Sequence, residues 1–187
     1  MPQEHVMVDI ETLGTDLASV ILSIGAVRFD IETLELSESL KFECLLDAQV
    51  QTNAGLSCNL DTIFWWLRQG EAARITLFGE AAQSNAMHPA DALEEFANFC
   101  EGASYLWSNG PTFDSSLLRE AFKRFEVVWP FKYNADRDVR TVMTIAQAAG
   151  WDGPNENVYQ HLVAHHALHD AIRQAHYVCD ALAFLKG

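Results

Sequence analysis

Two acidic residues, Asp9 and Glu11, end an apolar run that is typical of a buried strand. Residues two positions apart on a strand point to the same side of it. Burying two carboxylates together without a partner is costly, and a bound cation is the usual remedy. The pair therefore predicts a metal-dependent catalytic centre, provided that other parts of the chain supply further acidic ligands.

Two later segments supply acidic residues at suitable positions. Asp114 follows a short apolar segment and an Asn-Gly-Pro turn, and we expect it in the first turn of a helix. Ligand groups collect at such strand ends in α/β sheets, although a carboxylate there can simply stabilise the helix N-terminus. Asp170 lies near the start of a strongly amphipathic helix, and His165 precedes it by five residues. We expect these groups to meet Asp9 and Glu11.

The histidines near Asp170 also admit a second interpretation. His165 and His169 are four residues apart and would share one face of a helix, as the histidines of some zinc sites do. The zinc-protease motif requires Glu directly after the first His, where this chain has His166. A zinc hydrolase and a solvated helix start without any site both stay open at this point.

The hydrophobic pattern predicts the elements that would position these residues. Strands are expected over 5–10, 18–30, 34–45 and 104–108, the first three as an antiparallel meander. Helices are expected from Asn59 or Asp61 to Gly70, from Pro89 through Cys100, and over 112–125, 138–149 and 166–185. This order predicts an α/β domain, with a mixed sheet flanked by helices.

Composition narrows the class of protein. The chain has 187 residues, 49% of them hydrophobic, which fits one domain with a sizeable core. A net charge of −14 argues against a protein that grips long duplexes, but it permits one that holds a short strand end. No apolar run reaches the length of a membrane span, and the N-terminus does not resemble a secretory signal. The four cysteines are widely spaced, so we expect free thiols and a cytoplasmic protein.

The acidic residues and the histidine occur in the order D-x-E, D, H-x4-D, and in this order the chain resembles a known family. It is similar to the DEDDh branch of the DnaQ-like 3'-5' exonucleases, which have a ribonuclease H-like fold. The matching segments are Asp9-Ile10-Glu11-Thr12, Asn109-Gly110 through Phe113-Asp114, and His165 to Asp170-Ala171. The similarity runs from residue 5 to about 185. The Trp65-Trp66 pair followed by Gln69 resembles a sub-branch that includes phage exodeoxyribonuclease A-like enzymes and bacterial ribonuclease AS.

This resemblance implies a metal-dependent 3'-5' exonuclease that hydrolyses single-stranded DNA or RNA from the 3' end to 5'-mononucleotides. Two Mg²⁺ or Mn²⁺ ions would be bound by Asp9, Glu11, Asp114 and Asp170, because these hard ions prefer carboxylate oxygens. Asp9 would bridge both ions, and His165 would accept the proton of the attacking water as general base. The enzyme would form one exonuclease domain over residues 1–187, and a homodimer is implied because relatives often pair.

The resemblance also implies where the substrate binds. Backbone amides around Thr12, Leu13 and Gly14 would contact the terminal 3'-hydroxyl, and Leu13 would wedge between the last two bases. Trp66 or its neighbour Trp65 would stack on a terminal base. Three more residues are expected to contact the substrate: Gln69, Asn109 and Phe113. The alternative is a nucleic-acid-binding or partner-binding module on the same fold without turnover, although such a module has no need of converging carboxylates.

Overall fold

The computed structural model describes residues 4–187, apart from the side chains of residues 37–39. Within these residues one sheet has five strands in the order β3-β2-β1-β4-β5. The strands are β1 (His5–Thr12), β2 (Ile21–Asp30), β3 (Glu35–Leu45), β4 (Tyr105–Ser108) and β5 (Asp136–Asp138). The first three pair antiparallel, whereas β4 pairs parallel with both β1 and β5. The predicted meander and the mixed α/β sheet are confirmed.

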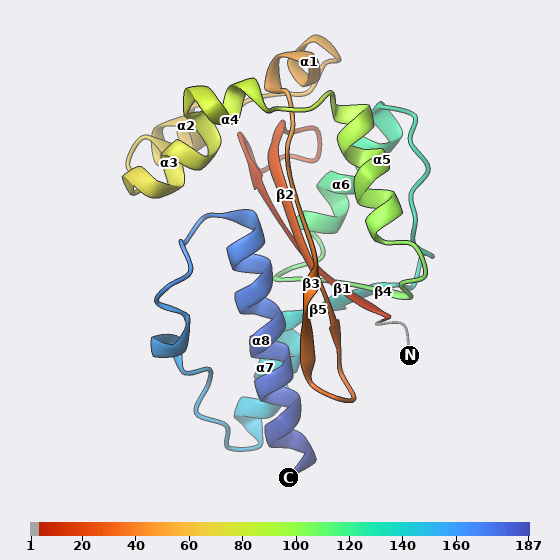
Figure 1. The fold of residues 1–187 in the computed structure, drawn as a ribbon, viewed down its shortest axis with the longest axis vertical. Helices are drawn as coiled ribbons and strands as arrows, with labels where there is room; N and C mark the ends of the chain where they lie inside the picture. Colours follow the sequence, from red (N-terminus) through yellow and green to blue (C-terminus); the bar gives the residue numbers. More distant parts are fainter. Residues whose placement is uncertain (1–3) are drawn as a thin grey trace.

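Helices cover both faces of this sheet, as Figure 1 shows. The helical elements are α1 (Ala48–Asn53), α2 (Leu60–Trp66), α3 (Glu71–Phe78), α4 (Glu80–Ser84), α5 (Pro89–Phe99), α6 (Asp114–Arg124), α7 (Val139–Ala148), the 3-10 turn η1 (Glu156–Tyr159) and α8 (Ala167–Lys186). The sequence pattern did not predict α1, α3, α4, β5 or η1. Strand β2 begins at residue 21 rather than 18, because the preceding residues form a turn and a bridge to Ser57.

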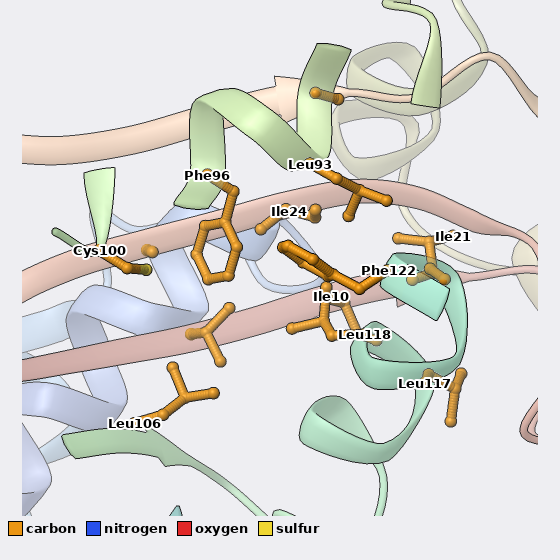
Figure 2. Packing of buried hydrophobic residues seen from close by; sticks show 14 of the residues in the cluster. Ile10, Ile21, Ile24, Leu93, Phe96, Cys100, Leu106, Leu117, Leu118 and Phe122 are labelled. Carbon is orange, nitrogen blue, oxygen red and sulfur yellow. The ribbon is translucent and has the colours of Figure 1, made fainter. Parts of the chain in front are cut away.

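The largest core lies between the sheet and the pair of helices α5 and α6. Phe96 of α5 and Phe122 of α6 are fully buried, with ring centroids 6.3 Å apart. Figure 2 shows both rings over the strand residues Ile10 and Ile24. Burying each such side chain contributes about 1.5–3 kcal/mol, so this core fixes the position of β1.

On the opposite face, α8 packs along β1 and β2. Its inward residues are small, with Ala171 and Ala175 fully buried against Met7 and Val27. Small side chains let the helix lie close to the sheet, so polar groups at its N-terminal end come near the end of β1. Among the described residues, no helix is both long and apolar enough to span a membrane.

Helices α2, α3 and α4 form a separate arm over residues 60–84, on the same side of the sheet edge as the start of α8 (Figure 1). The arm is attached by Trp66, which is only 2% exposed and packs against Leu22 and Leu77. The Trp66 indole N–H donates a hydrogen bond to the carbonyl oxygen of Thr12 at 2.9 Å. The arm is therefore tied to the end of β1.

Candidate active site

Strand β1 presents its two acidic residues toward α8. Asp9 and Glu11 point to that helix, whereas the residue between them, Ile10, packs in the opposite core. Asp9 pairs across the sheet with Gly25, where an added Cβ would lie 2.0 Å from the backbone nitrogen of Leu168. Because Gly25 has no side chain, the start of α8 can lie directly beside the acidic pair.

Two helix starts bring the other predicted residues to the same place. Asp114 is the first residue of α6 and is 4% exposed, and Asp170 lies in the first turn of α8. His165 precedes α8 with a left-handed backbone (φ 59°), and its N–H donates to Asp170 Oδ2 at 2.9 Å. One ligand atom each of Glu11, His165 and Asp170 lies within 4.8 Å of the other two.

These residues face one pocket of about 380 Å³. The lining residues are Asp9, Ile10, Glu11, Asn109, Phe113, Asp114, His165, Asp170, Arg173, Gln174 and Tyr177. The structure thus brings together the four acids and the histidine that the sequence singles out, along with two of the predicted substrate positions, Asn109 and Phe113. The acids come from three elements, β1, α6 and α8, which are far apart in the sequence.

Burial raises the pKa values of three of these acids, and neighbouring carboxylates add to the effect at Asp9 and Glu11. Burial, together with the charges of Asp114, Glu11 and Asp170, raises the pKa of Asp9 well above its usual range. Burial and the neighbouring acids Asp170 and Asp114 raise the pKa of Glu11 to about 8. Burial raises the pKa of Asp114 to about 6, against a lowering effect of backbone N–H groups. The protein therefore holds acids that favour a positive charge between them.

Residues on α8 that sequence reasoning missed support the acids. Gln174 Nε2 donates to Asp9 Oδ1 at 2.7 Å, and Arg173 forms an ion pair with Asp170 while also donating to the carbonyl oxygen of Leu162. Both follow Asp170 at three and four residues, where a helix presents side chains on one face. That spacing is the signal that could have identified them.

The predicted base-stacking role of Trp66 does not fit the structure. Its ring is 2% exposed and its N–H is bonded to Thr12, so no face is free for a base. Trp65 is 40% exposed, and its ring lies edge to face with that of His165 at a centroid distance of 4.8 Å. Gln69 is partly exposed, and its side-chain amide donates to the carbonyl oxygen of Trp65, outside the pocket lining.

The turn after Glu11 is tightly built. The Thr12 hydroxyl donates to the carbonyl oxygen of Gly14 at 2.7 Å, and an added Cβ on Gly14 would lie 2.5 Å from Ser19 Oγ. Leu13 lies partly exposed at the edge of the cluster that holds Trp66. None of these three residues lines the pocket itself, but they directly follow Glu11, which does.

The structure gives no support to a zinc site built on His165 and His169. His169 Nδ1 accepts the backbone N–H of Val163 at 3.0 Å, and its ring stacks on His166 at 4.1 Å. Among the described residues, the group of possible metal ligands that includes His165 does not include His169. The four cysteines are free thiols, and only Cys58 of them is exposed.

The donor set fits a hard divalent cation. Carboxylate oxygens predominate, and the charges of neighbouring acids add to burial in raising the pKa values of Asp9 and Glu11. Mg²⁺ and Mn²⁺ prefer such oxygen ligands, whereas zinc sites use sulfur and imidazole more often. Bound cations would remove the repulsion that the carboxylates otherwise experience.

Several solved structures have a similar fold, and two of the three described here are named as nucleases. Cell-death related nuclease 4 (CRN-4) has a TM-score of 0.65 and 12% identity over 94% of this chain, which spans 62% of the CRN-4 chain. Pop2p of S. pombe, in an Mg²⁺- and Mn²⁺-bound form, has a TM-score of 0.62 and 15% identity over 95% of this chain and 82% of its own. The nuclease domain of 3'hExo, a DEDDh family member bound to rAMP, has a TM-score of 0.60 and 13% identity over 96% and 91%.

Among curated proteins, none matches the sequence significantly. The model of one protein family, described as 3'-5' exoribonuclease Rv2179c-like domain, matches residues 4–182. This match covers all five residues of the predicted D-x-E, D, H-x4-D set. The similarity to DEDDh 3'-5' exonucleases on a ribonuclease H-like fold is confirmed. The chain belongs to the 3'-5' exoribonuclease Rv2179c-like family.

Proposed function

We propose that this protein removes nucleotides one at a time from the 3' end of single-stranded RNA and releases 5'-mononucleotides. The convergence of Asp9, Glu11, Asp114, Asp170 and His165 at one pocket carries the proposal. RNA is the proposed substrate rather than DNA because the matching family is described as exoribonucleases. The net charge of −14 also suits an enzyme that holds only a short strand end.

Two Mg²⁺ or Mn²⁺ ions would be held by Asp9, Glu11, Asp114 and Asp170. When bound, they supply neutralisation of charge at phosphorus and an activated water. Gln174 orients the Asp9 carboxylate by its hydrogen bond. Arg173 lies at the same pocket and is the cation that balances Asp170 in the protein itself.

His165 would act as general base. Its ring lies near Glu11 and Asp170, on the pocket side where the water would be held. An imidazole accepts a proton readily near neutral pH. The backbone bond from His165 to Asp170 links the base to one of the metal ligands, so the two groups keep a defined relation.

The 3' end would be recognised by the turn of residues 12–14. Its position directly after Glu11 supports contact between its backbone and the terminal 3'-hydroxyl, with Leu13 as the wedge between bases. Asn109 and Phe113 line the pocket and would contact the last nucleotide. The 1–187 segment would act as one exonuclease domain; nothing in the comparisons supports the homodimer that the resemblance implied.

A degradation assay tests this function. The substrates are 5'-labelled single-stranded RNA and DNA of one sequence, each with a free or a phosphorylated 3' end. We expect Mg²⁺- or Mn²⁺-dependent shortening of RNA from a free 3' end, slower shortening of DNA, and none with EDTA or with Asp9→Asn. Tight binding of the strands without shortening would instead indicate a nucleic-acid-binding module, and cleavage within the strand would exclude an exonuclease.

A further inference from the structure

The ring of His165 lies against both tryptophans of α2. Its centroid is 4.8 Å from that of Trp65 and 6.2 Å from that of Trp66, with interplanar angles of 79° and 85°. The two indoles lie 4.9 Å apart at 77° to each other. The imidazole plane is therefore nearly perpendicular to both indole planes, a geometry that favours edge-to-face attraction.

The two tryptophan side chains are held in place by the buried position of Trp66. Trp66 is buried in the cluster that attaches the arm, and its N–H is bonded to Thr12, the residue after Glu11. Trp65 packs on Trp66, so the position of Trp66 relative to β1 also determines that of Trp65. Strand β1, which carries Asp9 and Glu11, thus also determines where the two indoles that contact His165 lie.

The hydrogen bond described for His165 is made by its backbone and not by its ring. It follows a loop after η1, and its backbone has the left-handed conformation (φ 59°) that non-glycine residues rarely adopt. The hydrogen bond to Asp170 comes from its backbone N–H, which leaves the ring free to rotate about the side-chain bonds. Among the described residues, its aromatic ring contacts are with Trp65 and Trp66, so these are the groups placed to restrict it.

We propose that Trp65 is a positioning residue for the base: together with Trp66 it holds the His165 imidazole toward Glu11 and Asp170. This proposal rests on the proposed role of His165. Of the two indoles, Trp65 is the testable one, because it is 40% exposed and its loss spares the buried cluster. The arm would then contribute to the chemical step by orienting the His165 imidazole. A well-oriented catalytic group accelerates a reaction far more than a mobile one does.

Base stacking is the competing role for an exposed tryptophan, and kinetics separates the two. A stacking residue contributes to substrate binding, so its loss raises KM. A positioning residue acts in the chemical step, so its loss lowers kcat at nearly constant KM. In addition, a residue that acts through His165 has no effect once His165 is gone.

The experiment measures kcat and KM on single-stranded RNA with Mg²⁺ for five proteins and one control variant. They are the wild type and the variants Trp65→Leu, Trp65→Phe, His165→Ala and the double variant Trp65→Leu with His165→Ala. Phe64→Leu, an exposed aromatic change on the same helix, is the matched control. Thermal unfolding of each variant verifies the fold.

We expect Trp65→Leu to lower kcat about 10-fold or more, within the range of general base catalysis, with KM changed less than about 3-fold. Trp65→Phe keeps an aromatic ring and should recover most of kcat. In the His165→Ala background, Trp65→Leu should change nothing further. A rise in KM that persists without His165 would overturn the proposal in favour of stacking.

A structural readout separates failure of this proposal from failure of the proposed function. NMR of the metal-free protein with labelled histidines should show the His165 ring signals shifted by the indole ring currents, and Trp65→Leu should move them toward free-histidine values. Unmoved signals with unchanged kcat in Trp65→Leu would overturn the positioning role. Wild-type kcat in His165→Ala would instead overturn the general-base role.

Discussion

At the scale of single residues, the four acids depend on neighbours that carry no catalytic role. Gln174 is one of these, because its amide N–H donates to Asp9 and favours the charged form of that carboxylate. Groups that orient metal ligands in this way typically contribute 10-fold to 100-fold to metal affinity. The amide oxygen of Gln174 is buried without a hydrogen-bond partner among the described residues. The contact of this side chain with the site is therefore made by its amide N–H, which donates to Asp9.

Gln174→Leu should therefore weaken Mn²⁺ binding by about 10-fold to 100-fold, measured by calorimetric titration at pH 7.5. The reason is that Asp9 loses the one hydrogen bond that lowers its pKa and so competes less well with protons for the ion. Activity at saturating Mn²⁺ should recover most of its wild-type value. Gln147→Leu, an exposed change on α7, is the control, and equal Mn²⁺ affinities in both variants would exclude this role for Gln174.

The acidic residues of the site could be predicted from the sequence, whereas the roles of the residues around them could not. Asp9 and Glu11 could be identified because two carboxylates rarely share one side of a buried strand unless a cation lies between them. Which of two adjacent tryptophans faces the core was not predictable, because neighbouring helix positions differ by 100° and the orientation of α2 depends on tertiary packing. Trp66 was predicted to meet the substrate, whereas its indole is bonded to Thr12 inside the structure.

At the scale of elements, the close approach of α8 to the sheet determines the site. The Gly25 position illustrates this, since a Cβ there would lie 2.0 Å from the Leu168 nitrogen and 2.2 Å from the Ala167 carbonyl carbon. These are backbone atoms, which cannot rotate away. Any side chain at this position must displace the helix start and, with it, Asp170.

Gly25→Ala should destabilise the protein by about 1–3 kcal/mol, as overpacked cores do, and should lower activity more than this loss explains. Urea unfolding gives the first quantity, and the rate of RNA shortening at a temperature where the variant stays folded gives the second. Gly70→Ala is the control, because an added Cβ there has no atom within 4 Å. Full activity of Gly25→Ala would show that the approach of α8 is not needed.

Elements with a clear hydrophobic period were predictable, and short polar ones were not. The central strands β1 and β2 are buried along almost their whole length, so their residues are mainly apolar. Strand β5 consists of Asp136, Arg137 and Asp138, which no strand pattern includes. It is a strand because β4 offers it a parallel edge, and such pairing depends on the fold rather than on local sequence.

At the scale of the whole molecule, the site affects stability through its charge. A carboxyl group whose pKa is raised by folding binds its proton more tightly in the folded state than in the unfolded chain. The free energy of unfolding then falls as pH rises between the two pKa values. For Glu11 this interval runs from 4.5 to about 8, and for Asp114 from 3.8 to about 6.

The pKa shifts of histidines and cysteines determine in which pH range the carboxyl groups alone control the change in stability. Burial lowers the pKa of His5 and of His169, so their contribution to stability rises with pH mainly below the unfolded histidine value of 6.5. Burial raises the pKa of Cys44 to about 12, which lowers stability only near and above the ordinary thiol value of 9.0. Between pH 6.5 and 8, the raised pKa values of the buried acids Glu11 and Asp9 therefore dominate the change in stability.

In EDTA, the melting temperature should fall as pH rises from 6.5 to 8. Each carboxyl group, Glu11 or Asp9, can account for at most about 2 kcal/mol over this interval, and each kcal/mol corresponds to about 2–4 °C for a chain of this size. Saturating Mg²⁺ should abolish the fall, because the ion replaces the proton as the partner of the carboxylates. Calorimetric melting scans at several pH values measure both slopes.

General repulsion in a chain with a net charge of −14 would also lower stability as pH rises, and two controls distinguish it from the site. High NaCl screens exposed charges but leaves a buried cluster largely unaffected, so the slope in EDTA should persist in salt. Glu11→Gln removes one of the titrating groups, so its slope should be flatter than that of the wild type. A slope that salt removes and Glu11→Gln retains would place the effect on the surface, away from the catalytic acids.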